Sequence, residues 1–136
     1  MSVLLIIHLL LTAAYAGFQW TVQVVVYRQF ALVPAAVFVD YERAHQRRIS
    51  LVVGPLFGGQ VVTAAALLIT GGGWLRFVSM GLLAMILLIT ALVAVPLHRR
   101  LTAGFDAGAY RSLLRVDLAR ALLATVNAGV AAGLLR

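Results

Sequence analysis

Long apolar stretches without charged side chains dominate this chain. No Asp, Glu, Lys or Arg occurs in residues 1–27, 49–75 or 77–97, and a fourth apolar stretch, 121–135, follows the charged residues Asp117 and Arg120. A helix of about 20 mostly apolar residues crosses a bilayer core that is about 30 Å thick. The pattern therefore predicts an all-α fold, an integral membrane bundle of four transmembrane helices.

The breaks between these stretches predict the helix bounds. We expect helices at about 3–28, 49–70, 74–96 and 110–135, in one transmembrane domain that covers residues 1–136. Pro34 predicts a turn after the first helix, because proline disfavours helical backbone in the residue before it. The charged segment 40–48 is amphipathic, which predicts a position at the membrane interface. The glycines 71–73 predict a tight hairpin between the second and third helices.

The basic residues predict the orientation of the bundle. The net charge is +7, every basic residue is Arg, and most Arg residues lie in or beside the two connections 28–48 and 98–115. The positive-inside rule places these connections in the cytoplasm and both termini outside it. Topology therefore explains the charge, and we exclude nucleic acid as a partner. We expect a multi-pass protein of the bacterial inner membrane whose lipid headgroups bind Arg47, Arg48, Arg99 and Arg100.

A polar stripe follows one face of the first predicted helix. Tyr15, Gln19, Gln23 and Tyr27 are spaced four residues apart and share this face. Polar side chains are costly in a membrane unless they are paired, so the stripe should face the bundle interior or a partner chain. Two interpretations remain open, an interhelical amide network and a polar ligand pocket. Both would include two further amides at similar depth, Gln60 and Asn127.

Two charged residues lie one helical turn apart in the fourth helix, Asp117 and Arg120. An ionisable pair inside a membrane is a candidate functional site. The alternative is a local ion pair in which Arg120 extends toward the lipid headgroups. The chain contains no cysteine, which excludes a disulfide and a thiolate metal site.

The three histidines are candidate ligands. His45 and His98 lie in the two Arg-rich connections, and with Asp117 they would form an iron, copper or zinc site. The alternative is that both are solvated interface histidines. His8 is either a hydrogen-bonded core residue or an axial ligand to a haem or chlorophyll. The candidate cofactor-binding residues are thus His8, Gln19, Gln60 and Asn127, although we expect no intrinsic cofactor.

Two pairs of glycines have the spacing that lets helices approach closely. Gly54 and Gly58 form one pair, and Gly129 and Gly133 form the other. Such pairs indicate either packing within the chain or a contact between two copies of it.

Segments in both halves of the chain resemble a family of short four-helix bacterial membrane proteins of unknown function. They are also distantly similar to membrane-bound anthrone-oxygenase-type proteins. The resemblance is carried by the segments Trp20–Tyr27, Phe38–Ile49, Val53–Pro55, Val95–Leu101, Gly104–Asp106 and Leu114–Arg120. It covers most of the chain and includes His45, His98 and Arg120.

The chain also departs from the pattern of this family. The family pattern has His and Pro where Val26 and Arg28 stand, an acidic residue in place of Gln60, and Asn-Trp in place of Asp117-Leu118. If the family pocket binds a metal, the chain lacks two of the candidate ligands. The resemblance then implies a former enzyme that has become a structural subunit.

These observations support two functional hypotheses. The first is an accessory, non-catalytic subunit that binds lipid or pigment within a larger bioenergetic or photosynthetic complex, with membrane lipids and other subunits or a second copy as partners. The second is a small metal-dependent oxygenase or oxidase for a lipophilic substrate. In the enzyme, His45 and His98 would hold the metal, Asp117 and Arg120 would orient the substrate, and Gln60 would line the pocket.

Overall fold

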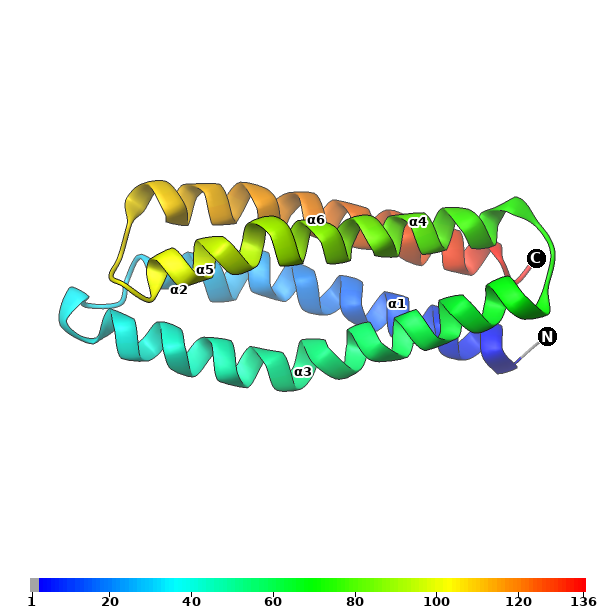
Figure 1. Ribbon diagram of the computed structural model, residues 1–136, viewed down its shortest axis with the longest axis horizontal. Coiled ribbons are helices and arrows are strands. Elements are labelled where there is room, and N and C mark those ends of the chain that lie inside the picture. The colour runs from blue at the N-terminus through cyan, green and yellow to red at the C-terminus, as the bar shows by residue number, and fades with distance from the viewer. Residues whose placement is uncertain (1–2) are drawn as a thin grey trace.

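The computed structural model describes residues 3–136 and is entirely α-helical in its regular elements. Four long apolar helical rods, each long enough to cross a membrane, span Val3–Phe30, Ala35–Thr70, Trp74–Leu101 and Ala107–Gly133. They pack as a bundle (Figure 1). The predicted fold class, a multi-pass membrane helical bundle, is therefore confirmed.

Two of the rods are divided into shorter elements. The first rod consists of α1 (Val3–Thr21), the π-helical turn η1 (Val22–Val26) and α2 (Tyr27–Phe30). The second is the single helix α3 (Ala35–Thr70). The third consists of α4 (Trp74–Ile89), the π-helical turn η2 (Thr90–Ala94) and α5 (Val95–Leu101), and the fourth is α6 (Ala107–Gly133).

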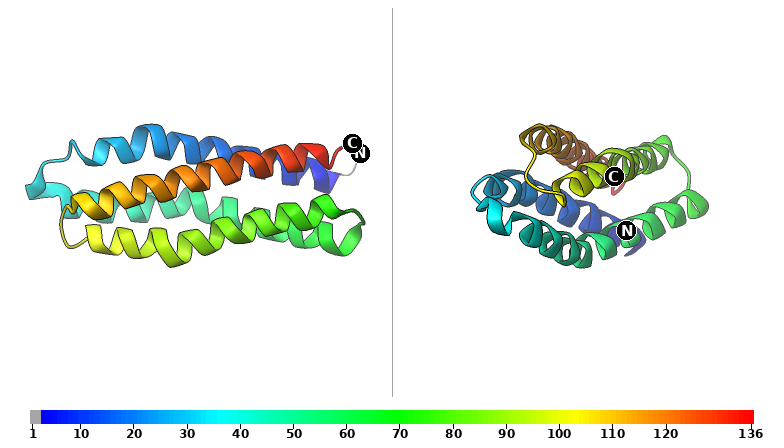
Figure 2. Two further views of the ribbon diagram at one scale, coloured as in Figure 1. Left: turned by 90° about the horizontal axis from the view of Figure 1, so that it is seen from above. Right: turned by 60° about the vertical axis from the view of Figure 1, so that its left-hand side comes forward.

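The rods form a ring in which each has two main neighbours. α1 packs against α3 and α6, and α4 packs against the same two helices. Chain direction alternates, so the start of α1 and the end of α6 lie at the same end of the bundle as the glycine turn 71–73 (Figure 2). We call this the glycine end. The opposite end, which carries the connections 31–34 and 102–106, is the arginine end.

Two helices extend further at the arginine end than the sequence predicts. α3 begins at Ala35, directly after Pro34, so residues 40–48 belong to the same continuous helix as residues 49–70. No glycine or proline interrupts residues 35–53, and this allows one unbroken helix. α5 continues beyond Pro96 to Leu101. The two extensions bring Glu42 and His98 into the bundle interior.

The π-helical turn η2 explains why the third rod continues past proline. Pro96 lacks a backbone N–H, and its ring clashes with the carbonyl of the preceding turn in a regular α-helix. η2 ends at Ala94, immediately before α5, and its wider turn relieves this clash. π-helical turns are often found at functional sites, and here both η1 and η2 border the same cavity.

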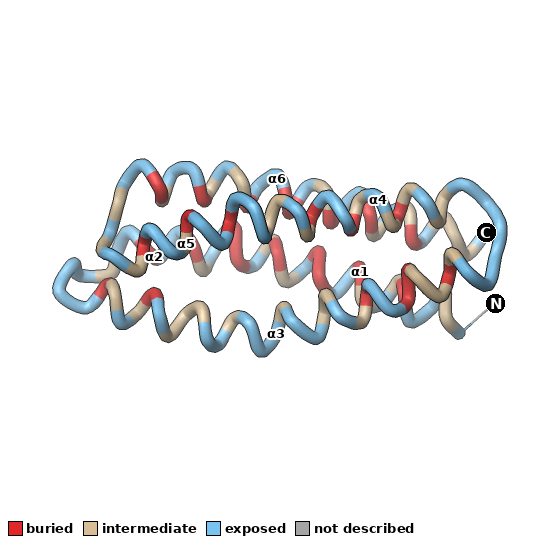
Figure 3. Tube along the Cα trace, in the orientation of Figure 1, coloured by how far each residue is buried: buried red, intermediate tan, exposed pale blue. Residues whose placement is uncertain are grey.

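Buried residues face the interior of the bundle (Figure 3). Many of them are polar, and many large apolar side chains are exposed on the outside. Leu10, Val62 and Leu92 are more than 60% exposed, as expected for side chains in contact with lipid. Glu42, Asp117 and Tyr15 are instead 0% exposed. In a membrane the drive that buries apolar groups in water is absent, and interior packing and hydrogen bonds hold helices together.

The glycine pairs do not mark close packing within the chain. A Cβ atom at Gly54, Gly58 or Gly129 would meet no atom within 4 Å in residues 3–136, and one at Gly133 would meet Leu75 at an ordinary 3.6 Å. The close approach lies at Gly59, where a Cβ would come within 2.9 Å of Leu11. A side chain at Gly59 would therefore have to displace the end of the Leu11 side chain.

Candidate functional site

The buried polar side chains form three clusters along the bundle. His8, Gln19 and Tyr27, all on the first rod, each belong to a different cluster. At 1.5 Å per residue, the distance from His8 to Tyr27 along the helix is about 28 Å, close to the thickness of a bilayer core. The clusters therefore lie near the glycine end, in the middle and near the arginine end.

The glycine-end cluster joins all four rods through His8. His8 Nδ1 lies 2.8 Å from Thr63 Oγ1 on α3, and His8 Nε2 lies 2.9 Å from Ser79 Oγ on α4. Ser79 in turn donates to Asn127 Oδ1 on α6 at 2.7 Å. Both ring nitrogens of His8 are engaged, so the structure places this residue as a hydrogen-bonded core histidine. An axial-ligand role would require one of these bonds to break.

The central cluster is built around the ion pair of Asp117 and Arg120. Arg120 Nη2 donates to Asp117 Oδ1 at 2.6 Å, and Arg120 Nη1 donates to Thr90 Oγ1 at 3.0 Å. Gln19 Nε2 donates to Asp117 Oδ1 as well. With its amide oriented to match its neighbours, Gln23 donates to Asp117 Oδ2 at 2.9 Å. Asp117 therefore accepts bonds from three side chains, and this compensates for the burial of its charge.

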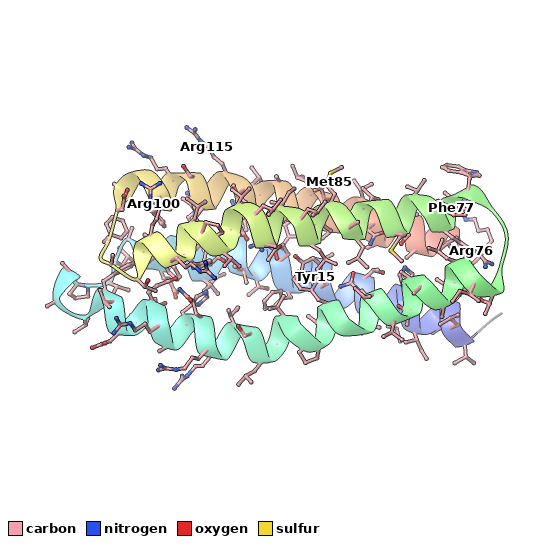
Figure 4. All side chains as sticks on the ribbon, in the orientation of Figure 1. Tyr15, Arg76, Phe77, Met85, Arg100 and Arg115 are labelled. Carbon is pink, nitrogen blue, oxygen red and sulfur yellow. The ribbon has the colours of Figure 1, made fainter. Side chains whose placement is uncertain are left out.

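Arg120 does not extend to the membrane surface. Its side chain is 7% exposed and that of Asp117 is 0% exposed. The expected alternative, in which Arg120 reaches the headgroups, is therefore not the arrangement in the structure. In contrast, Arg47, Arg48, Arg99 and Arg100 are all exposed near the arginine end. Figure 4 shows Arg115 directed away from the bundle, whereas Tyr15 points into its interior.

The arginine-end cluster is a chain of hydrogen bonds through His98. Tyr27 Oη lies 2.8 Å from His98 Nε2, and His98 Nδ1 lies 2.5 Å from Glu42 Oε1. Gln46 Nε2 also donates to Glu42 Oε1 at 3.0 Å. Glu42 is 0% exposed, and its contacts with His98 and Gln46 fix the orientation of the imidazole. The rings of His45 and His98 stack with centroids 5.7 Å apart.

A cavity of about 310 Å³ lies between the central and arginine-end clusters. Its polar lining comes from both clusters and includes Gln19, Tyr27, Thr90, His98 and Arg120. Its apolar lining includes Phe18, Val22, Ile49, Val53, Ala94 and Val95.

The cavity opens sideways between two rods. Ser50 on α3 and both Val95 and Arg99 on α5 line it and are exposed. α3 has few contacts with α5. The cavity is therefore open to the outside of the bundle between α3 and α5.

The predicted site residues fall into different clusters. His45 and His98 lie side by side, but their carboxylate neighbour is Glu42, and Asp117 is engaged by Arg120 and Gln19. In residues 3–136, no group of three or more His, Cys, Asp or Glu side chains is arranged to hold a metal ion. The metal site therefore stays a prediction, and the structure adds no geometry in its favour.

The predicted amide network is only partly formed. Gln19 and Gln23 join Asp117, and Asn127 joins the glycine-end cluster. Gln60 is buried, but its amide donates to Leu56 O on its own helix at 3.2 Å. The amides thus belong to separate clusters, and Gln60 lies outside the cavity lining.

Sequence reasoning missed Glu42, which is the buried carboxylate of the arginine-end cluster. The sequence places Glu42 in a charged interfacial segment, because five of the nine residues 40–48 are charged. One signal was present in the sequence: Glu42, His45 and Gln46 have the three- and four-residue spacing of a single helix face. The hydroxyl partners Thr63, Ser79 and Thr90 gave no comparable signal, because isolated Ser and Thr are common in transmembrane helices.

Comparisons of the chain with protein-family models, with curated proteins and with solved structures found no match.

Proposed function

We propose that this protein binds a lipophilic molecule in the cavity between its helices, with the polar head of the molecule inside and its apolar part toward the lipid. The observation that carries the proposal is the cavity itself, which combines apolar walls with converging polar groups from Tyr27, His98 and Arg120. Small-molecule sites have this composition, and their volumes start at about 300 Å³. The sideways opening suits a ligand supplied by the membrane.

This proposal agrees with an accessory, non-catalytic role in a larger bacterial inner-membrane complex of the bioenergetic or photosynthetic type. A bound lipid or pigment would fill the cavity and stiffen the bundle, and partner subunits would cover part of the apolar surface. Four rods arranged in a ring offer little interior for packing, so a ligand or a partner chain adds contacts that the bundle lacks.

The test is to identify what co-purifies with the protein. The tagged chain is purified in mild detergent, and mass spectrometry identifies both the extracted small molecules and any associated chains. Ala94→Phe fills the cavity, because Ala94 is buried and lines it. Ala91→Phe, in the same turn but exposed, is the matched control. Val53→Phe provides a second way to block the cavity from α3.

We expect one lipophilic compound in near-stoichiometric amount with the unaltered protein and with Ala91→Phe. It should be lost with Ala94→Phe and Val53→Phe. Identical extracts from all four proteins, each with the composition of the bulk membrane, would refute ligand binding. Recovery of the protein in a large complex would support the accessory role, and a small homogeneous particle alone would count against it.

The second candidate is an oxygenase or oxidase for a lipophilic substrate. It is favoured by the hydrogen-bonded chain of Tyr27, His98 and Glu42, because two of these residues line the cavity and could exchange protons with a bound molecule. Metal analysis and an absorption spectrum of the same purified peak test it. About one metal per chain, lost in His45→Ala and His98→Ala, would favour the enzyme over the accessory subunit.

A further inference from the structure

A second hollow, an open groove, lies where the first rod meets α3. The groove has a volume of about 480 Å³. It is lined by Val26 of η1 and by one face of α3, namely Tyr41, Ala44, His45, Arg48, Ile49 and Val52. The cavity and the groove share only Ile49 among their lining residues, so the groove is a separate candidate site.

The lining of the groove changes from polar to apolar along α3. An α-helix rises 1.5 Å per residue, so the groove extends over about 16 Å from Tyr41 to Val52. The charge-free stretch of α3 begins directly after Arg48, which places Arg48 at the border between the lipid headgroups and the hydrocarbon core. Tyr41 lies on the headgroup side of this border, and Val52 lies on the hydrocarbon side. The groove therefore offers polar and apolar surface in the order in which a membrane lipid needs them.

Arg48 supplies the charge of the groove and is available to a ligand. Its side chain is exposed, and none of the salt bridges within residues 3–136 includes it. No carboxylate lines the groove, and the exposed carboxylate of the same helix, Asp40, lies about two turns away. Arg43 and Arg47 are also exposed on this part of α3 and add positive charge nearby. The surroundings of Arg48 thus favour an anion and disfavour a cationic headgroup.

We propose that the groove binds one anionic phospholipid, with its phosphate on Arg48 and an acyl chain along Ile49 and Val52. A guanidinium matches the geometry of a phosphate group and can donate two parallel hydrogen bonds to it. A zwitterionic lipid would bring a second, positive group close to the arginines. This inference goes beyond the proposed function, because it concerns a different site and a lipid that stays bound at the surface of the bundle.

The test measures the binding of single lipids to the purified protein in mild detergent by native mass spectrometry. The probes are phosphatidylglycerol and phosphatidylcholine, each with two oleoyl chains. We expect the first phosphatidylglycerol to bind about fivefold more tightly than the first phosphatidylcholine, which is the expected effect of one basic side chain on an anionic headgroup.

Two neighbouring arginines separate the groove from the general charge of the arginine end. Arg48→Gln should lower the affinity for phosphatidylglycerol about fivefold, to that for phosphatidylcholine. Arg47→Gln removes the same charge one residue away, outside the groove lining, and should keep the preference. Ala44→Leu fills the groove and should weaken the binding of both lipids. Ala36→Leu, exposed on the same helix but outside the lining, should weaken neither.

Three results would overturn the proposal. Equal affinities of the two lipids for the unaltered protein would show that the groove does not select an anionic lipid. Equal losses in Arg48→Gln and Arg47→Gln would assign the preference to the charge of the whole end. Displacement of the lipid by an equal concentration of glycerol phosphate would show that the anion binds without an acyl chain in the groove.

The outcome does not depend on the most disruptive variant. Arg47 and Arg48 are both exposed, so the comparison of their variants decides the question even if Ala44→Leu does not fold. None of the four substituted residues lines the cavity, so a failure here leaves the proposed function intact.

Discussion

Glu42 Oε1 lies 2.5 Å from His98 Nδ1, although 56 residues separate the two positions in the chain. The contact joins α3 to α5 where these helices otherwise touch little. It also orients His98 toward Tyr27 and thereby toward the cavity. This hydrogen bond therefore links the stability of the arginine end to the shape of the candidate site.

Replacing Glu42 should destabilise the bundle substantially. Glu42→Ala leaves the buried donors of His98 and Gln46 without their acceptor, and a hydrogen bond to a charged group contributes about 1.5–3 kcal/mol. We expect a lower thermal midpoint, measured by intrinsic tryptophan fluorescence in detergent. Asp40→Ala is the matched control, because Asp40 is exposed on the same helix. Equal midpoints for the two variants would contradict this role of Glu42.

Asp117 and Arg120 should depend on each other. Removing one partner of a buried ion pair costs about 3–5 kcal/mol, whereas replacing both by apolar residues can be neutral. We expect Asp117→Leu to lower the thermal midpoint strongly and the double variant Asp117→Leu/Arg120→Leu to recover most of the loss. Arg100→Leu, which breaks an exposed ion pair with Asp106, should have little effect. Additive losses in the double variant would show that the two residues act independently.

His8 should act as a structural connector. His8→Ala removes two hydrogen bonds and leaves Thr63 and Ser79 without this partner, so we expect a loss of about 1–3 kcal/mol in the free energy of unfolding. Ser79→Ala should be disruptive through the same cluster, because it breaks the links to His8 and Asn127. Both variants should keep the absorption spectrum of the unaltered protein. Loss of a visible band only in His8→Ala would instead identify a pigment ligand.

The helical rods were predictable because their signal is local. A charge-free stretch of 20 or more residues identifies a membrane helix by its length and composition alone. The polar stripe of the first rod also identified residues that face inward, since Tyr15, Gln19, Gln23 and Tyr27 are all buried. Helical periodicity determines such a shared face without any knowledge of the neighbours.

The partners of these residues were not predictable in the same way. The charged neighbours of Glu42 in the sequence predict an interfacial position. In the structure the side chain of Glu42 is buried on the inner face of α3. The sequence suggests Asp117 as a metal ligand beside His45 and His98. In the structure its carboxylate instead accepts hydrogen bonds from Gln19 and Arg120. Pairing depends on the rotation of each helix and on the extra residue that η2 inserts before Pro96, and neither follows from composition.

Alanine at two neighbouring glycines should have different effects. Alanine favours helix over glycine by up to about 1 kcal/mol. At Gly58 a Cβ meets nothing within 4 Å in residues 3–136, so Gly58→Ala should be neutral or stabilising. At Gly59 the Cβ would lie 2.9 Å from Leu11, and the displacement of that side chain offsets the gain. Gly59→Ala should therefore have the lower thermal midpoint, whereas a lower midpoint for Gly58→Ala would indicate that a second chain packs on this face.

Asp106 should make the first turn of α6 sensitive to acid. Its Oδ1 accepts from the backbone N–H of Ala109 at 2.8 Å, and this bond holds the pKa of Asp106 below its ordinary value. Because the folded pKa is lowered, the stabilisation is fully present above the unfolded pKa of about 3.9 and is lost as pH falls through the folded value.

Hydrogen exchange at the start of α6 measures this effect. After correction for intrinsic rates, protection of the peptide that contains Ala109 should fall between about pH 5 and pH 2 in the unaltered protein. In Asp106→Asn it should change less, since Asn is a comparable N-cap that does not titrate. The rest of the chain is identical in both proteins, so the difference between them isolates Asp106. The same loss of protection in both proteins would assign the acid sensitivity to another group.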